Sequence, residues 1–405
     1  MKKRDDFYQN IEEELTLLTE QGTYKHLRYL ESKMAGSANY EKEGELIILC
    51  SNNYLGLCDK TELIMAGQQA LAKYGAGAAS VRFICGTFDI HRRLEELTAQ
   101  FLGMEACLTY SSCWAANTAV IPALLNPGDT VISDELNHAS IIDGCQATKK
   151  GVNRVVYRHS DMADLASKLA SCQDSPVILI VTDGVFSMEG DIAKLPEIIA
   201  EAEKFGALVM VDDSHATGVI GSKGKGTMEY YGLTAGVDII SGTYGKALGG
   251  AGGGFIAAKK AICETLIQKS RPHLFSNALP PVLCAIAIAA IDYLKEHPES
   301  VTSLKAKTEY LRNKIFAAGL NPLSSDSAII PIIVGETATA IEASQKMIEK
   351  GLFAIGFGFP VVPEGTARIR LQVSDALSYP QLDKAVTVIS AVLSEITKKE
   401  SKHSD

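Results

Sequence analysis

The chain has 405 residues, of which 46% are hydrophobic, and it carries 39 basic and 48 acidic side chains for a net charge of −9. This length suffices to bury a large core in two or three domains. An acidic chain without a long run of lysine and arginine interleaved with aromatics argues against nucleic acid as the main partner. The nine cysteines form no C-x-x-C pair and are odd in number. This argues against a disulfide framework or a zinc site, so we expect no metal.

The chain shows no sign of membrane targeting. Its start, "MKKRDDFYQNIEEEL", runs from basic side chains straight into acidic ones and lacks the apolar centre of a secretory signal. The longest apolar stretch, "ALPPVLCAIAIAAI" at 278–291, is too short to span a bilayer and contains two prolines. We therefore expect a cytoplasmic protein without membrane contact, with a core helix at that stretch.

The first segment of the chain is expected to form an N-terminal arm, residues 1–58. Residues 7–30 show the helical spacing of apolar side chains, with Phe7, Ile11, Leu15 and Leu18 on one face. The stretch "EGELIILCSNNYLGL" then predicts a short strand that enters a turn.

Residues 59–288 are expected to form a large α/β domain. Short β-branched runs ("EACLTY", "DTVIS", "RVVY", "PVILIV", "ALVMVDD", "VDIIS") alternate there with helical patterns. This alternation predicts a mostly parallel sheet with helices on both faces. The remainder, 289–405, carries long amphipathic helices around "AIIPIIV" and "ARIRLQVS", which indicates a smaller α+β domain.

The stretch "SGTYGKALGGAGGG", residues 241–254, surrounds Lys246 with glycines. A phosphate loop would need glycine at 240 and serine or threonine at 247, where the chain has isoleucine and alanine, and no dinucleotide fingerprint is complete. Two readings remain. The glycines merely let backbones cross beside a solvated lysine, or Lys246 forms an imine with a carbonyl cofactor and has partners elsewhere in the chain.

The partners that pyridoxal phosphate would need follow predicted strands. Its ring nitrogen requires an anion, and Asp212 in "ALVMVDDSHATG" is the first polar residue after a buried strand. His215 lies in the same turn, within reach of the ring's phenolic oxygen. An acid after a strand is often only a helix N-cap, a role that fits Asp213 better.

Three further stretches end at the same predicted sheet edge. The small-residue turn at 111–113 precedes a helix that begins near Trp114, a suitable place for a phosphate. His138 in "SDELNHASIIDG" is placed to stack on a flat ring, although a lone histidine there is more often structural. Ser187 in "TDGVFSMEGD" is another polar group at this edge.

Together, "NNYLGL", "NHASIIDG", "TDGVFSMEGD", "VMVDDSHATG" and "GTYGKALGG" closely resemble the α-oxoamine synthases, pyridoxal-phosphate enzymes of fold type I. The resemblance covers nearly the whole chain. "ASVRFICGT", "YSSC" and "SRPHLFSNALPP" look most like the branch that joins glycine to acetyl-CoA in threonine and glycine metabolism. The resemblance thus implies an acyltransferase with pyridoxal 5'-phosphate as cofactor and 2-amino-3-oxobutanoate and CoA as products.

The resemblance also implies a role for each matching residue. Lys246 would carry the Schiff base and act as general base, Asp212 would pair with the ring nitrogen, and His215 would reach the phenolic oxygen. His138 would stack on the ring and donate to the thioester oxygen. The remaining roles are phosphate binding by Cys113, Trp114 and Thr243, phosphate binding from the second subunit of a homodimer by Ser276 and Asn277, carboxylate binding by Arg370, and contact with the acyl carbonyl by Asn52.

Some positions depart from the family pattern, and we expect them to touch the pocket walls: Tyr244, Trp114 and Leu371. The role of Arg82 in "ASVRFIC" stays open. So do a sister synthase with another acyl-CoA or amino acid, a transaminase using the same Lys246 and Asp212, and a binding protein without catalysis. The family further suggests functional coupling to a threonine dehydrogenase.

Overall fold

A computed structural model describes residues 2–401, and the chain divides into two units. The large unit holds residues 52–306 and 325–328, and the rest of the described chain forms the small unit. The three-part division expected from the sequence, with boundaries at 58 and 288, stays a prediction.

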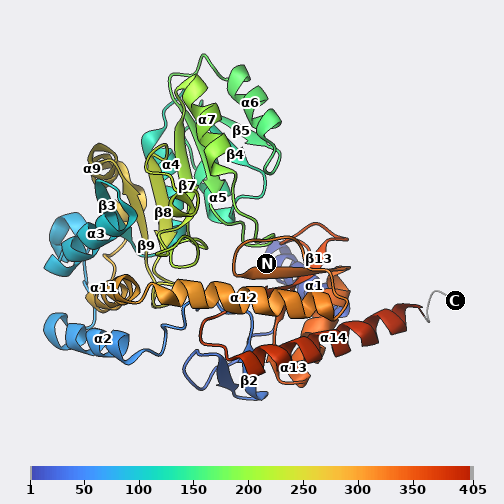
Figure 1. The fold of residues 1–405 in the computed structure, drawn as a ribbon. Coiled ribbons are helices and arrows are strands. Elements are labelled where there is room, and N and C mark those ends of the chain that lie inside the picture. Colours follow the sequence, from blue (N-terminus) through green and yellow to red (C-terminus); the bar gives the residue numbers. More distant parts are fainter. Residues whose placement is uncertain (1, 402–405) are drawn as a thin grey trace. The chain divides into compact units, whose positions relative to one another are not determined.

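The large unit is built on a seven-stranded sheet in the order β3-β9-β8-β7-β6-β4-β5 (Figure 1). Its strands are β3 (Ala106–Tyr110), β4 (Thr130–Asp134), β5 (Asn153–Tyr157), β6 (Ile178–Asp183), β7 (Leu208–Asp212), β8 (Ile239–Thr243) and β9 (Gly254–Ala258). The pairs β5–β4, β4–β6, β6–β7 and β7–β8 are parallel, whereas β9 runs antiparallel to both of its neighbours. The mostly parallel sheet expected from the apolar runs is confirmed.

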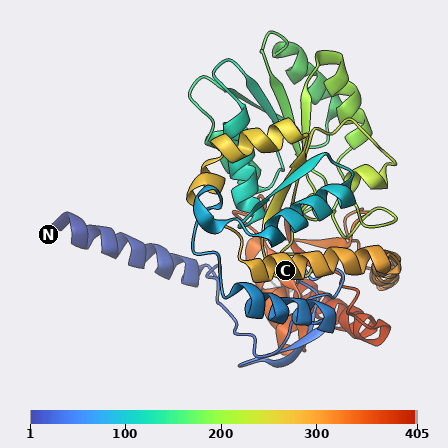
Figure 2. The same cartoon turned by 90° about the vertical axis from the view of Figure 1, so that its left-hand side faces the viewer.

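Helices lie along both faces of this sheet (Figures 1 and 2). The large unit contains the helices α2 (Thr61–Tyr74), the short π-helix η1 (Arg82–Gly86), α3 (Asp89–Leu102), α4 (Cys113–Leu124), α5 (Ala139–Gln146), α6 (Met162–Ser171), α7 (Leu195–Phe205), α8 (Thr227–Tyr230), α9 (Lys260–Lys269), α10 (Arg271–Phe275) and α11 (Pro281–Glu296). α4 packs on α5 and α9, and α6 packs on α7. Since both faces are covered, β6 and β4 are buried at every position.

The parallel strands of the sheet all end at one edge, and three of them end in an aspartate. β4 ends at Asp134, β6 at Asp183 and β7 at Asp212, while β8 ends at Thr243. The register pairs Asp183 with Asp212, so these two carboxyl groups occupy neighbouring strand ends. The carboxyl edge of a parallel sheet is where α/β folds place ligands, and this edge is the most polar part of the buried sheet.

The small unit contains two three-stranded sheets, β1-β2-β11 and β10-β13-β12. Its elements are α1 (Lys2–Glu20), β1 (Ser37–Tyr40), β2 (Gly44–Ile48), β10 (Ile329–Gly335), α13 (Thr337–Glu349), β11 (Leu352–Phe353), β12 (Ile355–Phe357), β13 (Ala367–Gln372) and α14 (Tyr379–Ser401). The helix α12 (Glu299–Ala317) begins in the large unit and ends in the small one. The smaller α+β architecture expected at the C-terminal end is confirmed.

The N-terminal helix is shorter than its sequence pattern indicates. We expected helical spacing over 7–30, but α1 ends at Glu20. The chain leaves the helix at Gly22, whose φ of +66° is a left-handed conformation that glycine adopts without strain. Within residues 2–401, no helix combines the length and the hydropathy needed to cross a bilayer.

Candidate functional site

A pocket opens at the carboxyl edge of the large sheet. Its lining comes from the turns after five strands: Ser112, Cys113, Trp114, His138, Ser140, Asp183, Val185, Asp212, Ser214, His215, Thr243 and Lys246. The structure therefore brings Lys246 together with Asp212, His215 and His138, although more than 100 residues separate His138 from Lys246 in the sequence.

The Asp212 carboxylate accepts two short hydrogen bonds, besides longer contacts from the Cys113 thiol at 3.8 and 4.0 Å. The side-chain amide of Asn117 donates to Oδ2 at 2.6 Å, and the backbone N–H of Ser214 donates to Oδ1 at 2.8 Å. Asn117 lies inside α4 and is fully buried. The sequence analysis missed it, although a single amide in an otherwise apolar helix is a signal for a buried polar contact. These contacts aim one carboxylate from the end of β7 into the pocket.

The neighbouring Asp213 has a structural role, but it is not the helix N-cap that the sequence suggested, because the N-cap of α8 (Thr227–Tyr230) is Gly226. Its carboxylate accepts hydrogen bonds from the backbone N–H of Thr227 at 2.9 Å and from the Thr227 hydroxyl at 2.6 Å. Thr227 is the first residue of α8, so Asp213 anchors the start of a helix. Burial raises the pKa of Asp213 to about 6. The two adjacent aspartates thus point to different tasks.

His138 both starts a helix and faces the pocket. It is the N-cap of α5, and its Nδ1 lies 2.7 Å from the Ser140 hydroxyl and 3.2 Å from the Ser140 backbone nitrogen. Its ring meets Trp114 edge to face, with centroids 5.8 Å apart. Burial lowers the pKa of His138, and the Lys246 charge also lowers it, against an opposing effect of Asp212. The imidazole is therefore neutral at pH 7.

Lys246 stands on a loop that is closed at its base. The backbone N–H of Tyr244 donates a hydrogen bond to the carbonyl of Gly253 at 3.0 Å. Gly249 and Gly250 have φ of +91° and +67°, and a Cβ on Gly250 would lie 2.4 Å from the Cys58 sulfur. The glycines are needed both for left-handed backbone and for close packing. The backbones pack closely, as the first reading expects, but Lys246 is half-buried and lines the pocket, which favours the second. Imine formation by Lys246 stays a prediction.

The pocket residues fit pyridoxal phosphate by their chemistry. Lys246 supplies an amine for an aldehyde, and Asp212 supplies an anion for a ring nitrogen. The N-terminal end of α4 borders the same pocket and favours a phosphate. This end of α4 packs closely on β9. A Cβ on Gly254 would lie 2.3 Å from the Cys113 backbone nitrogen, so only glycine at position 254 allows the turn to keep its conformation.

Asp183 is a pocket residue that the sequence analysis did not select. Its Oδ2 accepts the backbone N–H of His138 at 3.0 Å, and its backbone N–H donates to the Asn137 side chain at 2.8 Å. Burial raises the pKa of Asp183, and the charge of Asp212 raises it further. Asp183 ends an apolar run in the same way as Asp212, so the same sequence signal was available.

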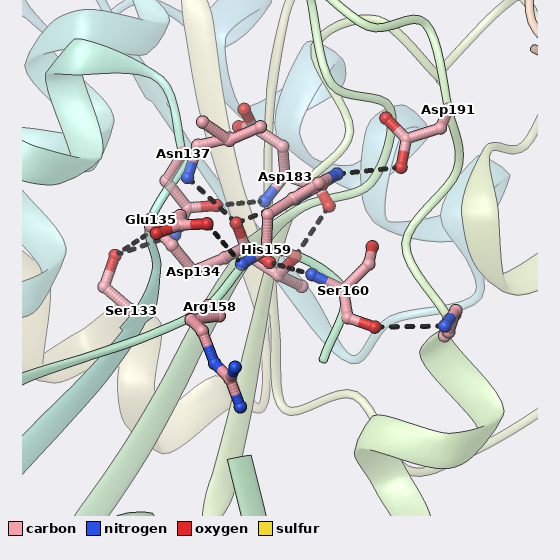
Figure 3. Close-up of polar contacts among 12 residues, drawn as sticks. Ser133, Asp134, Glu135, Asn137, Arg158, His159, Ser160, Asp183 and Asp191 are labelled. Carbon is pink, nitrogen blue, oxygen red and sulfur yellow. Dashed lines mark hydrogen bonds and ion pairs between the residues drawn. The ribbon is translucent and has the colours of Figure 1, made fainter. Parts of the chain in front are cut away.

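Beside the pocket lies a second histidine cluster, which we call the His159 clamp: His159, Asp134 and Asp191 (Figure 3). His159 Nδ1 lies 3.0 Å from Asp134 Oδ1, and its Nε2 lies 3.1 Å from Asp191 Oδ2. Burial alone would lower the pKa of His159, but the hydrogen bonds to the two carboxylates raise it to about 10. The clamp ties the turn after β5 to the end of β4 and to the loop after β6.

Four predicted site residues of the large unit lie outside this pocket. Among the described residues, the lining does not include Asn52, Ser187, Ser276 or Asn277. Ser187 is half-buried two residues beyond Val185, and Asn52 is exposed. Ser276 and Asn277 are exposed after α10, where the chain pairs with Val81.

Arg370 lies on β13 of the small unit. It is buried, donates to the Gln372 side chain at 2.8 Å and stacks on the Phe357 ring with 4.5 Å between guanidinium and centroid. Arg368 lies on the same strand two residues earlier, so both arginines are on one face of it, and Arg368 donates to the Thr366 carbonyl.

Three positions that the sequence left unexplained have clear contacts. Tyr244 does not line the pocket: its ring is buried against Phe255, and its hydroxyl bonds Thr98 at 2.8 Å. Leu371 is fully buried on β13. The expectation that Tyr244 touches the pocket wall is therefore not supported, because its side chain points into the core beside α3. Trp114, the third of these positions, does line the pocket.

Arg82, the first residue of η1, forms a half-buried ion pair. Its guanidinium contacts both carboxylate oxygens of Glu95, at 2.7 and 3.1 Å, and donates to Thr109 at 2.9 Å. The π-helix is thus anchored to α3 and β3 by a two-point contact.

Comparisons with known proteins agree with this geometry. The family model of class I and II aminotransferases matches residues 44–389. The mitochondrial 2-amino-3-ketobutyrate coenzyme A ligase of Bos taurus is 45% identical over 93% of this chain and 90% of its own length. The enzyme of the same name from Escherichia coli K12 is 42% identical over 96% and 98%. An 8-amino-7-oxononanoate synthase from Thermoanaerobacter pseudethanolicus is 44% identical over 94% and 96%.

Solved structures share the fold over nearly the whole chain. Serine palmitoyltransferase from Sphingomonas wittichii superposes with a TM-score of 0.91 at 29% identity, covering 97% of this chain and 98% of that one. A high-resolution structure of SPT with PLP superposes equally well, at 30% identity and the same coverage.

Proposed function

Because the chain belongs to the class I and II aminotransferase family, we propose that its pocket condenses glycine with acetyl-CoA to give 2-amino-3-oxobutanoate and CoA. Pyridoxal 5'-phosphate is the cofactor, and the chain is an acyltransferase. The carrying observation is the near full-length similarity, at 42–45% identity, to relatives named 2-amino-3-ketobutyrate coenzyme A ligase, combined with a pocket in which Lys246, Asp212 and His138 meet.

The bound cofactor supplies an electron sink that stabilises negative charge on the α-carbon of an amino acid. Lys246 is the group placed to take a proton from that carbon as general base. Asp212, whose carboxylate is fixed by Asn117 and Ser214, would pair with the ring nitrogen and favour its protonated form. His138 is neutral and can donate a hydrogen bond to the thioester oxygen as charge develops on it.

Phosphate binding is proposed for the N-terminal end of α4, through Cys113 and Trp114, together with Thr243 at the end of β8. The Thr243 hydroxyl is already organised, since it donates to the Gly253 carbonyl at 2.9 Å and accepts the Gly245 N–H at 3.0 Å. Contact of Arg370 with the substrate carboxylate, and of Asn52 and Ser187 with substrate or cofactor, stay predictions from the family pattern.

Catalysis is proposed to need a homodimer, with Ser276 and Asn277 reaching the site of the second subunit. The support is their exposure beside exposed apolar side chains on η1 and α10: Phe83, Ile84 and Phe275, which are 60%, 67% and 71% exposed. An exposed apolar cluster of this kind is typical of an interface. A cytoplasmic location and coupling to a threonine dehydrogenase stay predictions, and some relatives are named mitochondrial.

Subunit mixing tests the shared site. Lys246→Ala and Asn277→Ala homodimers would each be nearly inactive, but a 1:1 mixture would regain about a quarter of the wild-type activity, because half of its dimers hold one intact site. A mixture that stays inactive while dimers exchange would contradict the assignment of Asn277.

The reaction is tested by free-thiol release. The loaded protein is given glycine and acetyl-CoA, with each omitted in turn, and with succinyl-CoA, a long-chain acyl-CoA or alanine in place of one substrate. Release that requires glycine and is fastest with acetyl-CoA supports the proposal. Fastest release with another pair would favour the sister activity suggested by the similarity to 8-amino-7-oxononanoate synthase, and amino transfer without thiol release would favour a transaminase.

A further inference from the structure

His215, one wall of the pocket, is bonded on its far side to a tyrosine outside the pocket lining. The Tyr54 hydroxyl lies 2.7 Å from His215 Nδ1, and the two rings meet edge to face with centroids 6.1 Å apart. Tyr54 is fully buried and His215 is 8% exposed. A buried contact this short between two polar groups is a strong constraint on both side chains.

The backbone on each side fixes this contact. Tyr54 lies in a tight turn in which the Tyr54 N–H donates to the Asn52 carbonyl at 2.9 Å and the Gly56 N–H to the Asn53 carbonyl at 3.0 Å. His215 lies in the turn after β7, where Asp213 accepts the N–H groups of Ala216 and Thr217 through its carbonyl. Backbone hydrogen bonds therefore hold the turn on each side of the contact.

The two turns also pack against the lysine loop. A Cβ on Gly218 would lie 2.6 Å from the Ala247 Cβ and 3.5 Å from Leu55 Cδ1. The segments that carry Tyr54, His215 and Lys246 are therefore in contact next to these residues, and the tyrosine is built into the same wall as the amine.

The contact has a chemical consequence for the imidazole. A neutral imidazole has one nitrogen that donates and one that accepts, and the partner of one nitrogen decides the state of the other. A tyrosine phenol keeps its proton at neutral pH and can donate it. We propose that Tyr54 is a positioning residue that donates to His215 Nδ1, so that Nε2 carries the proton and the pocket side of the ring is a hydrogen-bond donor.

This assignment rests on the proposed function only for the identity of the acceptor, the phenolic oxygen of pyridoxal phosphate. With the opposite tautomer, Nε2 would be an acceptor and would repel an oxygen that carries negative charge. Tyr54 thus acts on the cofactor through His215 and does not touch it. The relationship matches the way in which outer partners orient a ligating histidine in metal sites.

The test compares two tyrosine-to-phenylalanine variants of the full chain labelled with ¹⁵N-histidine. Tyr54→Phe removes the hydroxyl from His215 and keeps the ring. Tyr110→Phe is the matched control, because the Tyr110 hydroxyl is also buried but is bonded to Ser270, at 3.2 Å, instead of to a histidine. His215→Asn assigns the resonance.

In the wild-type protein and in Tyr110→Phe, we expect the ¹⁵N spectrum to show an unprotonated Nδ1 and a protonated Nε2 for His215. Tyr54→Phe would give a mixture of tautomers, and in the loaded enzyme kcat/KM would fall about 10-fold. A protonated Nδ1 in the wild type, or an unchanged His215 spectrum in Tyr54→Phe, would overturn the proposal. The ¹⁵N spectrum of His215 does not depend on which acyl donor the enzyme uses. Failure of the proposed reaction would therefore be seen separately, in the thiol-release assay.

Discussion

Two histidine clusters at the same edge of the large sheet have opposite electrostatic characters. In the His159 clamp, two carboxylates hold the imidazole from both ring nitrogens and raise its pKa to about 10, so it is a permanent cation at neutral pH. In the pocket, burial lowers the pKa of His138, whose Nδ1 faces a serine hydroxyl. Histidine is thus part of a charged ion cluster in the His159 clamp, whereas in the pocket its imidazole is neutral and faces the cavity. The difference is whether carboxylates occupy both nitrogens.

The comparison predicts that substitutions in the pocket lower activity, whereas substitutions in the His159 clamp lower the free energy of unfolding.

The largest effect is expected from Lys246→Ala, which removes the proposed general base and covalent anchor and should lower kcat/KM by about 1,000-fold or more. Thiol-release kinetics measure this, together with loss of the visible absorption of bound cofactor. Urea unfolding of the apoprotein should be almost unchanged, and a large loss of stability would show that the lysine is structural.

Asp212→Asn keeps the size of the side chain but removes its charge. We expect kcat to fall by about 100-fold, because this variant lacks the negative charge proposed to keep the ring nitrogen protonated. Asp134→Asn is the matched change in the clamp and should leave kcat of the folded enzyme within about 3-fold while lowering stability. Equal losses of activity in the two variants would contradict the division between pocket and clamp.

His159→Gln removes the cation between Asp134 and Asp191. The free energy of unfolding should fall by about 2 kcal/mol, as for lost hydrogen bonds to charged groups, because the two carboxylates are left facing each other without it. Urea denaturation at pH 7 measures this difference.

The stability difference between wild type and His159→Gln should depend on pH. The pKa of His159 is raised in the folded protein from 6.5 to about 10. The contribution of the clamp is therefore fully present below pH 6.5 and is lost as the pH rises through about 10. Unfolding curves at pH 7, 9 and 10.5 should show the difference shrinking with pH, and a difference that grows toward pH 10.5 would contradict a charged clamp.

The smallest effect is expected from Trp114→Phe. It shortens one aromatic wall and weakens the edge contact with His138, a type of contact that contributes about 1 kcal/mol. We expect kcat/KM to change by less than about 5-fold, with the effect mainly in KM for acetyl-CoA. A much larger effect would mean that Trp114, and not His138, is the ring-stacking residue.

The pattern of apolar runs predicted the sheet and the two central site residues, Asp212 and Lys246, because both predictions depend only on the order of residues within short segments. Asp212 and Lys246 could be selected because each directly follows, or lies near the end of, an apolar run, and parallel strands bring their ends together. Asn117 and Asp183 were missed although each left a signal in the sequence, because only the packing of α4 and the pairing of β6 with β7 show that they reach the pocket. His159 also follows a predicted strand, but nothing local shows that Asp134 and Asp191 converge on it.

The reverse error occurred at Tyr244. Its position next to the glycine-lysine stretch suggested the pocket wall, but side chains alternate along a strand end, and this one points to Thr98 in the core. The end of α1 at Glu20 was also missed. Gly22 ends the helix in a left-handed conformation, although the helical spacing of apolar residues was expected to continue beyond it.

The closed base of the lysine loop limits how Lys246 can move. Since β8 and β9 pair directly up to Thr243 and Gly254, the loop is a hairpin whose two legs cannot separate without breaking the sheet. A Cβ on Gly249 would lie 2.9 Å from a Leu63 methyl carbon, and one on Gly250 would lie 2.4 Å from the Cys58 sulfur, so this part of the loop packs closely on its neighbours. If the loop backbone stays in place, the Lys246 amine would move between its two proposed roles, cofactor binding and proton transfer, by rotation about its own four-carbon stem. Catalysis in this chain would then require no backbone rearrangement at the lysine, and its local motion would be as fast as side-chain rotamer exchange.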